Sequence, residues 1–597
     1  MNWNPECNHI LRPIKDKWPS AYPPGVDVRE LLRHEAKGFN SRWGHVDFDK
    51  ADPAIILRAL EDYEEYNLMT DLSGNYVLMH GLAVRKEPDN SFSLKEQTRL
   101  NVEMVNRQKL VSFFRLSIGS LSKEQQKMLS NSPELQPYMR WLNATWEQHE
   151  HMLSEEIEQA MWSTYLSISA LKEVFIKSLR NESFKIPDLR PVPYKLGELR
   201  LLLQNPDSKT RQLAREPYKS ILERRSVEAK DWLNSILLLG KQQKHLRKWN
   251  RFDSSVMSQH EVNADDVDML LHVTKANEDL SAKYYAHLAK ILGVKKLKFH
   301  DTQINVGEVN KKIDLIDAYK LVLKVFNDID PEYSILVEEW FKNGQIHLQS
   351  LTQKSSGGAI ITRKFSPELV YVNFDGTIRS LIELTHELGH AIHFHLSKTQ
   401  GVFDYTPSIM MAEFASKYFE QAMYRELLSP ESDLLTPTEK MKLRIGALGK
   451  DIDSIFRQTS LYRFQLQLFN EYESKNNLTL IDVKNIFVNS MKDYVGNSLD
   501  LSDDIMPLDW IGWGHALQSF FYTYTYASGA LSAKGVYRMG ISKQVVRQVL
   551  SAGSSESPKE LFARLGIDIN SGAGWKAGIE ELRKELDSLF TNRAEIC

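Results

Sequence analysis

Two histidines four residues apart are the residues in this sequence whose types and spacing first suggest chemistry. The segment GTIRSLIELTHELGHAIHFHLSK contains His386 and His390, and Glu387 follows the first of them. Helical residues four apart project one turn from each other, so the two imidazoles can bind one zinc ion. Glu387 lies about 100° around the helix axis, which suits a general base acting on a water at the metal. Because zinc lowers the pKa of such a water from about 15.7 to about 7, these residues predict metal-assisted hydrolysis.

The residues around this motif predict the helix that positions it. Leu381, Leu384, Leu388 and Ile392 recur at spacings of three or four, which indicates an apolar helix face that is buried. The motif alone arises by chance in roughly a few per cent of chains this rich in His and Glu. Its place on an amphipathic helix, with Gly389 between the ligands and acidic residues on the next predicted helix, favours a metal site over surface histidines.

A catalytic zinc usually has three protein ligands and one open position. The downstream candidates are Asp404 in the loop-like segment GVFDYTPS, and Glu413 and Glu420 in the predicted helix SIMMAEFASKYFEQAM. Glu413 and Glu420 are seven apart and fall on the same side of that helix, so one can bind zinc while the other orients a ligand histidine. Geometry alone does not separate the two, and for either one an exposed helix carboxylate is the alternative.

Helical periodicity dominates the sequence on both sides of the motif. Asp52-Pro53 starts one predicted helix, and Ser93 with Glu96 forms a predicted capping box before another. Prolines at 187, 191 and 193 interrupt the pattern, so we place a domain boundary there, between an N-terminal helical domain of residues 1–195 and a catalytic domain of residues 196–597. Helices resume from about residue 208 to 249 and again from Thr377 to the end, where Ser557-Pro558 and Glu560 mark one start.

Three short segments predict strands. They are KKLKFHDTQI (295–304), GQIHLQ (344–349) and ELVYVNF (368–374), which are rich in residues that favour β-structure. The predicted fold class is therefore mainly α, with a small β-sheet beside the zinc-binding helix.

Length, charge and cysteine content exclude several classes of protein. A chain of 597 residues exceeds the usual size of one hydrophobic core, so two or more lobes are expected. A net charge of −3 from 75 basic and 78 acidic residues argues against a nucleic-acid partner. No apolar run approaches the roughly 18 residues of a membrane span. With no secretory leader pattern and only Cys7 and Cys597, we expect a soluble, cytoplasmic protein without a disulfide framework.

The motif and its surroundings resemble the oligoendopeptidase F and thimet oligopeptidase family of zinc metallopeptidases. The resemblance rests on HELGHAIH, on MAEFASKYFE, on VNFDGT just before the motif and on NPDSKTRQLARE near residue 205, and it spans about residue 200 to the mid-500s. It implies one zinc ion per chain, with Glu413 as the third ligand and Glu420 as the residue that supports a ligand histidine. His393 matches a histidine common in the family, and because the zinc already has three ligands, we interpret His393 as a structural residue or as support for a ligand. For His395, surface exposure is the simple interpretation.

A second segment of the resemblance is HALQSFFYTYTYASG, from His515 to Gly529. It implies that Tyr526 hydrogen-bonds the oxyanion with help from His515. Helical spacing brings Tyr522 and Tyr526 to within about 20° of His515 and turns Tyr524 away, whereas the same tyrosines alternate as in a strand. An aromatic core stripe is the alternative for each. The choice among the three tyrosines stays open, and Tyr522 and Tyr524 are also substrate-binding candidates.

The resemblance also concerns the substrate. It implies two helical lobes enclosing a deep channel that admits oligopeptides, and an extended edge in SGGAIITRKFSPELVYVNFDGT along which a peptide pairs as an added strand. Gly357, Gly358 and Ala359 are the candidate residues on that edge. The predicted activity is cleavage of internal bonds of short peptides.

Two other functions fit parts of the same pattern. A zinc carboxypeptidase of similar helical architecture is the nearest alternative, and it is distinguished by its failure on peptides blocked at both ends. A helical peptide-binding protein with structural zinc is the other, and it predicts that Glu387→Gln has no effect on function. Glu387 has no structural reason to be at that position, which disfavours this second alternative. The sequence leaves side-chain preference, substrate length and oligomeric state open.

Overall fold

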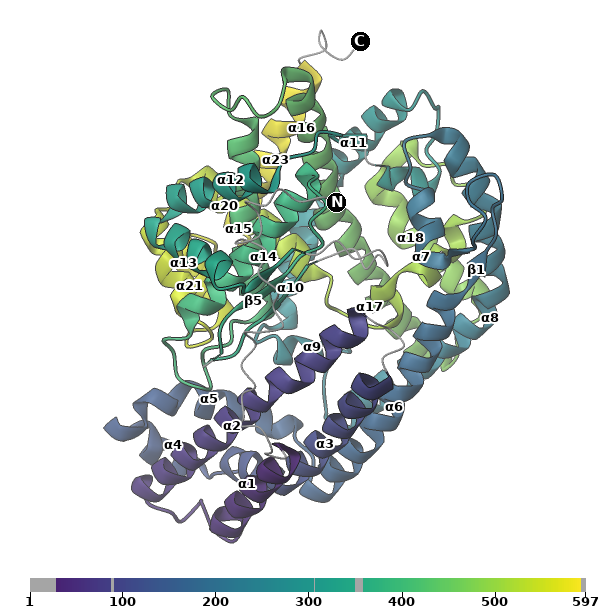
Figure 1. The fold of residues 1–597 in the computed structure, drawn as a ribbon. Coiled ribbons are helices and arrows are strands. Elements are labelled where there is room, and N and C mark those ends of the chain that lie inside the picture. Colours follow the sequence, from purple (N-terminus) through teal and green to yellow (C-terminus); the bar gives the residue numbers. More distant parts are fainter. Residues whose placement is uncertain (1–27, 87–90, 305, 349–357, 365, 592–597) are drawn as a thin grey trace. The chain divides into compact units, whose positions relative to one another are not determined.

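The fold is mainly helical with small β-sheets, as the sequence predicts (Figure 1). The computed structural model describes residues 28–86, 91–304, 306–348, 358–364 and 366–591. The chain divides into two compact units. Unit 1 consists of residues 1–169, 311–408 and 543–557, and unit 2 consists of residues 170–310, 409–542 and 558–597.

The N-terminal part of unit 1 is a helical bundle. Its helices are α1 (Val28–Trp43), α2 (Pro53–Lys86), α3 (Ser91–Gly119), α4 (Lys123–Ser130), α5 (Met139–Gln148) and the first part of α6 (Glu155–Asn181), with 3₁₀ turns η3 (Pro133–Tyr138) and η4 (His149–His151). Helices α1, α2 and α3 lie side by side (Figure 1). They bury a core in which Phe39 meets Phe114 edge to face at 5.3 Å between ring centroids.

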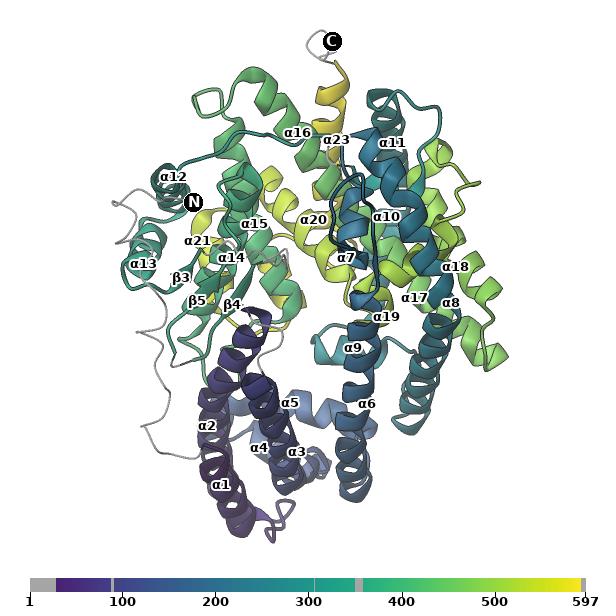
Figure 2. The ribbon, with the colours of Figure 1, turned by 45° about the vertical axis from the view of Figure 1, so that its right-hand side comes forward.

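The remainder of unit 1 places a small sheet against a long helix (Figure 2). Its elements are α12 (Leu315–Ile329), α13 (Pro331–Lys342), β3 (Ile346–His347), β4 (Ala359–Ile361), β5 (Leu369–Tyr371), α14 (Ile378–Ser397) and α21 (Lys543–Ser551). The strand order is β3-β5-β4. Strand β3 is parallel to β5, with Ile346 opposite Val370. Strand β4 is antiparallel to β5, with Ile360 opposite Val370, so β4 forms one edge of the sheet.

Unit 2 contains most of the remaining helices. They are the end of α6, α7 (Leu196–Leu202), α8 (Ser208–Leu246), α9 (Ser254–Gln259), α10 (Ala264–Lys275), α11 (Glu278–Ile291), α15 (Ile409–Leu428), α16 (Pro437–Ile452), α17 (Gln458–Lys475), α18 (Leu480–Val495), α19 (Gly514–Leu517), α20 (Tyr524–Met539), α22 (Pro558–Arg564) and α23 (Ala573–Thr591). The unit also holds the β1–β2 ladder (Ser183–Phe184 and Tyr194–Lys195), a π-helical turn η6 (Asp453–Arg457) and 3₁₀ turns η5 (Phe299–Gln303), η7 (Gly496–Ser498) and η8 (Met506–Gly512). Helix α20 packs against both α15 and α23, and its residues 527–536 are buried.

Several predicted helix starts agree with the structure and one does not. Helix α2 begins at Pro53, where the Asp52 carboxylate accepts the Ile55 N–H at 2.9 Å. Helix α22 begins at Pro558 as predicted. The predicted capping box at Ser93 is wrong, because α3 already begins at Ser91 and Ser93 lies inside its first turn.

One predicted strand is also wrong. Residues 299–303 of the segment 295–304 form the 3₁₀ turn η5, and only Leu297 makes an isolated bridge, to Leu499. The Asp301 carboxylate accepts the Lys298 N–H at 2.9 Å, and this bond closes the turn. The other two segments form β3 and β5 as predicted.

The two compact units do not follow a single cut in the sequence. The first change of unit falls between residues 169 and 170, and the chain returns to unit 1 twice. The predicted boundary between 195 and 196 therefore stays a prediction. Among the described residues, no helix combines the length and apolar character that crossing a membrane requires.

Candidate metallopeptidase site

The motif helix α14 begins at a residue that caps it. The Thr377 hydroxyl accepts the Ser380 N–H at 3.1 Å and so satisfies one of the free donors of the first turn. Thr377 is itself held by Asp375, whose carboxylate accepts its N–H at 3.0 Å. Burial opposes the charge of Asp375, but the hydrogen bonds from Thr377 lower the pKa of its carboxyl to about 2. The start of the helix is therefore fixed at physiological pH.

The apolar face of α14 anchors it in unit 1. Leu381, Leu384, Leu388 and Ile392 are all at most 1% exposed, as their spacing predicts. Each fully buried aliphatic side chain contributes about 1.5–3 kcal/mol. The helix also contacts β4, β5 and α21. Its other face is left to carry the polar side chains.

The two motif histidines lie together on that polar face. Their ring centroids are 4.9 Å apart and the rings are nearly perpendicular. His386 and His390 are partly exposed, whereas Glu387 is 8% exposed. Gly358, just before β4, lies directly against Glu387: a Cβ on Gly358 would be 2.3 Å from Cγ and 2.6 Å from Oε1 of that glutamate. Only glycine leaves room there for the carboxylate.

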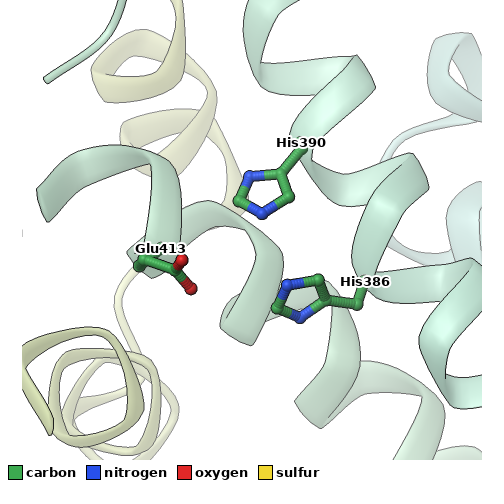
Figure 3. Close-up of side chains that lie close together, drawn as sticks. All are labelled: His386, His390 and Glu413. Carbon is green, nitrogen blue, oxygen red and sulfur yellow. The ribbon is translucent and has the colours of Figure 1, made fainter. Parts of the chain in front are cut away.

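Glu413 on α15 completes a group of three side chains that could hold a metal ion. One ligand atom each from His386, His390 and Glu413 lies within 4.8 Å of the others (Figure 3). Glu413 is buried at 9% exposure, which is costly for a carboxylate without a charged partner or metal. Asp404 is not part of this group.

Glu420, on the same helix, has another environment. It is 2% exposed, and its two carboxylate oxygens pair with Lys450 at 2.8 Å and Lys417 at 3.0 Å. These two ammonium groups compensate its buried charge. Support of a ligand histidine by Glu420 stays a prediction.

His515 and two tyrosines form a cluster in unit 2. His515 Nε2 lies 3.1 Å from the Tyr526 hydroxyl, and the His515 ring stacks on Tyr522 with centroids 5.5 Å apart. The Tyr522 hydroxyl donates to Glu413 Oε1 at 3.3 Å. The cluster therefore adjoins Glu413, one of the three candidate metal ligands.

Burial controls the protonation of this cluster. It lowers the pKa of His515, and Arg457 lowers it further. Burial and then the Glu413 carboxylate raise the pKa of Tyr526 to about 12. At neutral pH the site therefore presents a neutral imidazole and a phenol that still carries its proton.

The helical spacing of His515, Tyr522 and Tyr526 correctly predicts that their rings approach one another, but not the path of the chain between them. Tyr522 and Tyr526 do converge on His515, but no continuous helix brings them there. Helix α19 ends at Leu517 and α20 begins at Tyr524, and Phe521 between them has a left-handed φ of +59°. A turn in the chain, rather than a helical repeat, gathers the three rings.

Comparison with known protein families identifies the relationship. The family model described as peptidase family M3 matches residues 201–581. The chain belongs to peptidase family M3. A second model, described as oligopeptidase F, matches residues 118–175. All the candidate site residues fall inside the M3 match.

Individual relatives agree with this membership. The M3 chain is 25% identical over 494 residues to an oligoendopeptidase F homolog of Borreliella burgdorferi, covering 79% of this chain and 82% of that protein. It is 22% identical over 513 residues to an oligoendopeptidase F homolog of Lactococcus lactis subsp. lactis, covering 83% of each. The crystal structure of oligoendopeptidase F from Enterococcus faecium has the same fold, with a TM-score of 0.71 at 18% identity, covering 94% of this chain and 97% of that one.

Membership of family M3 makes this chain a metalloendopeptidase. The prediction of a peptidase related to oligoendopeptidase F is thus confirmed, and a metal is implied. Two imidazoles and a carboxylate whose ligand atoms lie within 4.8 Å are a donor set that suits such a metal.

The structure assigns Tyr524 to the interior of this M3 chain. It is completely buried, and its hydroxyl lies 3.0 Å from Nδ1 of His260. These contacts pack the Tyr524 ring in the interior, and its role in substrate binding stays a prediction. His260, which also meets Tyr522 edge to face, was missed because it lies more than 250 residues earlier and no motif surrounds it.

The two histidines after the motif differ from each other. His393 is 1% exposed, and burial lowers its pKa to about 3, so it is a neutral core residue as predicted. His395 is more than a surface residue: its Nδ1 lies 3.1 Å from the buried carboxylate of Glu368, which also pairs with Lys398 at 2.6 Å. Gly357 lies outside the described residues.

Proposed function

We propose that this chain is a zinc-dependent endopeptidase that hydrolyses internal peptide bonds of short oligopeptides. The observation that carries the proposal is the group formed by His386, His390 and Glu413, with the buried Glu387 beside it on α14. Membership of family M3 and the relatives named oligoendopeptidase F support the oligopeptide as substrate.

The three side chains would hold one zinc ion per chain, with a fourth position open to water or substrate. Two imidazole nitrogens and one carboxylate oxygen suit zinc, and both histidines are partly exposed. When bound, zinc would lower the pKa of a water molecule and polarise the scissile carbonyl.

Glu387 is the proposed general base. Its carboxylate would accept a proton from the attacking water and then give that proton to the nitrogen of the leaving amine. The Glu387 side chain has low exposure, and the missing side chain of Gly358 leaves the space that the carboxylate occupies. Both steps use a single carboxylate in two protonation states.

Tyr526 is the proposed donor to the negative charge that develops on the carbonyl oxygen. Its hydroxyl keeps its proton because its pKa is raised to about 12, and neutral His515 at 3.1 Å orients it. One such donor typically contributes about 2.7–4 kcal/mol to the transition state. Tyr522, which donates to Glu413, is proposed to fix that carboxylate and to line the substrate site.

Strand β4 is the proposed guide for the substrate backbone. Among the named strands it pairs only with β5, so its outer edge is available to a peptide that adds as a further strand. Gly358 and Ala359 begin this edge, immediately beside Glu387. Main-chain pairing of this kind accepts many peptide sequences, because its hydrogen bonds involve the backbone and not the side chains.

The test is cleavage of a fluorogenic oligopeptide blocked at both ends, combined with metal analysis. We expect cleavage by the zinc-loaded chain, its loss on chelation and its recovery with zinc. Glu387→Gln should retain zinc and lose at least about 10³ in kcat, a loss within the range typical of general base catalysis. Glu383→Gln, one turn earlier on α14, is the matched control and should be fully active.

Other outcomes of this experiment have clear meanings. Cleavage only of peptides with a free C-terminus would replace the endopeptidase by a carboxypeptidase. Unchanged turnover in Glu387→Gln would remove the general-base role. A larger loss of kcat in Tyr522→Phe than in Tyr526→Phe would move the oxyanion donor to Tyr522.

A further inference from the structure

A pocket in unit 2 lies outside the residues assigned to catalysis. It has a volume of about 570 Å³, is open to solvent on one side, and is lined by α15, α16, α20 and α23. Volumes of 300–1,000 Å³ are typical of sites for small organic ligands. Its lining residues are Gln421, Tyr424, Arg425, Leu428, Ser429, Pro430, Arg444, Ala447, Leu448, Asp451, Lys534, Glu581, Lys584, Glu585 and Ser588.

The charges in the interior of this pocket are largely compensated. Lys534, 2% exposed, pairs with Glu585 at 2.7 Å and with Asp451 at 2.9 Å. Arg425 lies over the ring of Tyr537 and pairs with Glu581 at 3.9 Å. These groups already satisfy one another and have little charge left for a ligand.

Two cations of the lining have no such compensation. Within the described part of the chain, neither Arg444 nor Lys584 forms an ion pair or a hydrogen bond. Arg444 comes from α16 and Lys584 from α23, so two different helices supply an uncompensated positive charge to one pocket. A guanidinium and an ammonium in this arrangement favour an anion.

Two buried polar side chains also lack partners. Gln421 is 8% exposed and Tyr424 is 9% exposed, and neither the amide nor the hydroxyl bonds to another described residue. Neither polar group is enclosed away from solvent, so both can hydrogen-bond to a molecule in the pocket. Leu428, Ala447 and Leu448 add an apolar wall.

We propose that this pocket binds the C-terminal end of a short peptide and that its occupation modulates catalysis. The terminal carboxylate would meet Arg444 and Lys584, the last amide would pair with Gln421 and Tyr424, and an apolar side chain would lie on the aliphatic wall. The choice of a peptide rests on the proposed function, because an endopeptidase releases a new C-terminal carboxylate at each cleavage.

Two helices connect this pocket to the candidate active site. Helix α15 carries Glu413 and, eight residues later, Gln421, while α20 carries Tyr526 and, eight residues later, Lys534. Eight residues correspond to about 12 Å along a helix axis. The two helices pack tightly on each other. A ligand that fixes their far ends therefore restricts the residues at their near ends.

The test is calorimetric titration of the full-length chain with N-acetyl-leucine, which carries the carboxylate, one amide and an apolar side chain. Titrations with and without bound metal separate this pocket from binding at the active-site metal. We expect binding in both states, at least tenfold weaker binding in Arg444→Ala/Lys584→Ala, and at least tenfold weaker binding of the uncharged methyl ester. Lys290→Ala/Lys295→Ala removes two exposed cations outside the pocket and should bind like wild type.

A second measurement concerns catalysis. Saturating N-acetyl-leucine should change kcat of the wild type at least twofold, and Arg444→Ala/Lys584→Ala should abolish this change. Equal binding of acid and ester, full binding by the double variant, or an effect on KM alone would overturn the proposal, and binding by inorganic phosphate with no binding of the acid would replace the ligand. Because the titration needs no turnover, it succeeds or fails independently of the peptidase mechanism.

Discussion

At the residue scale, the absence of a side chain at Gly358 leaves space for the side chain of Glu387. A methyl group there would lie 2.3–2.6 Å from the Glu387 side chain, closer than non-bonded atoms approach. We expect Gly358→Ala to displace the carboxylate and to lower kcat about 10²-fold, because small displacements of a reacting group cost that much. Steady-state kinetics on the end-blocked peptide measures the loss.

A matched glycine is available for comparison. A Cβ on Gly197 would meet no atom within 4 Å, so Gly197→Ala should leave kcat unchanged. Retention of full activity by Gly358→Ala would show that Glu387 tolerates a shift and would weaken its role as the base.

His260 predicts a pH dependence of stability. Burial lowers its pKa from 6.5 to about 4, so the folded chain binds its proton less tightly than the unfolded chain does. Stability contributed by neutral His260 is complete above about pH 6.5 and falls as pH drops towards 4, by up to about 3 kcal/mol. Denaturant unfolding of wild type and His260→Gln over pH 4–7 measures this, and the variant should lose less stability on acidification. Parallel pH profiles would contradict it.

Residue types and local spacing predict many of these residue-level features. The pair His386 and His390 needs only one turn of helix, so the sequence suffices to predict it. The pairing of His260 with Tyr524 and the contact of Gly358 with Glu387 join distant segments, and no helical or strand period relates such residues. The tertiary fold alone determines them.

At the scale of elements, α15 and α20 approach closely at the candidate metal ligand. A Cβ on Gly529 would lie 2.8 Å from the Glu413 carbonyl oxygen and 3.1 Å from its Cβ. We expect Gly529→Ala to separate the helices locally, to lower stability by about 1–3 kcal/mol and to weaken zinc affinity at least tenfold. Competition with a chromophoric chelator measures the affinity.

Gly578→Ala separates the two effects. It would place a Cβ 2.3 Å from the Leu531 carbonyl oxygen, on the contact of α20 with α23. This variant should lose similar stability and keep its zinc affinity. Equal loss of zinc by both variants would mean that general destabilisation, and not the position of Glu413, is responsible.

The existence of elements is easier to predict than their ends. Apolar periodicity correctly predicts α14, and Pro53 and Pro558 correctly mark helix starts. The predicted helix start at Ser93 is wrong because a Ser followed three residues later by Glu has the same sequence pattern inside a helix as at its start. The segment 295–304 fails because a turn closed by the Asp301 carboxylate outweighs the strand preference of its side chains.

At the scale of the whole molecule, the short segment 543–557 completes unit 1. Arg547 pairs with Asp330 at 2.6 Å, and the Ser554 N–H donates to the Asp404 carbonyl at 2.7 Å. We expect a fragment of residues 1–542 to lose at least tenfold of the hydrogen-exchange protection of residues 399–408, and a fragment of residues 1–557 to retain it. Equal exchange in the two fragments would show that the segment adds nothing to unit 1.

The sequence does not reveal this interleaving. Proline density near residue 190 marks a real interruption of helices, but a compact unit is defined by contacts between distant segments. The local amino-acid composition does not indicate which distant segments are in contact. The fold class is readable from the sequence, whereas the division into units is not.

The late position of residues 543–557 also affects how the chain is made. Ribosomes add about 5–20 residues per second, so this stretch is made roughly 10–30 seconds after α14, which ends about 150 residues earlier. Until then the nascent chain holds the motif helix α14 without α21, one of the elements that cover it. The motif helix therefore reaches its full packing only after this late segment has been made.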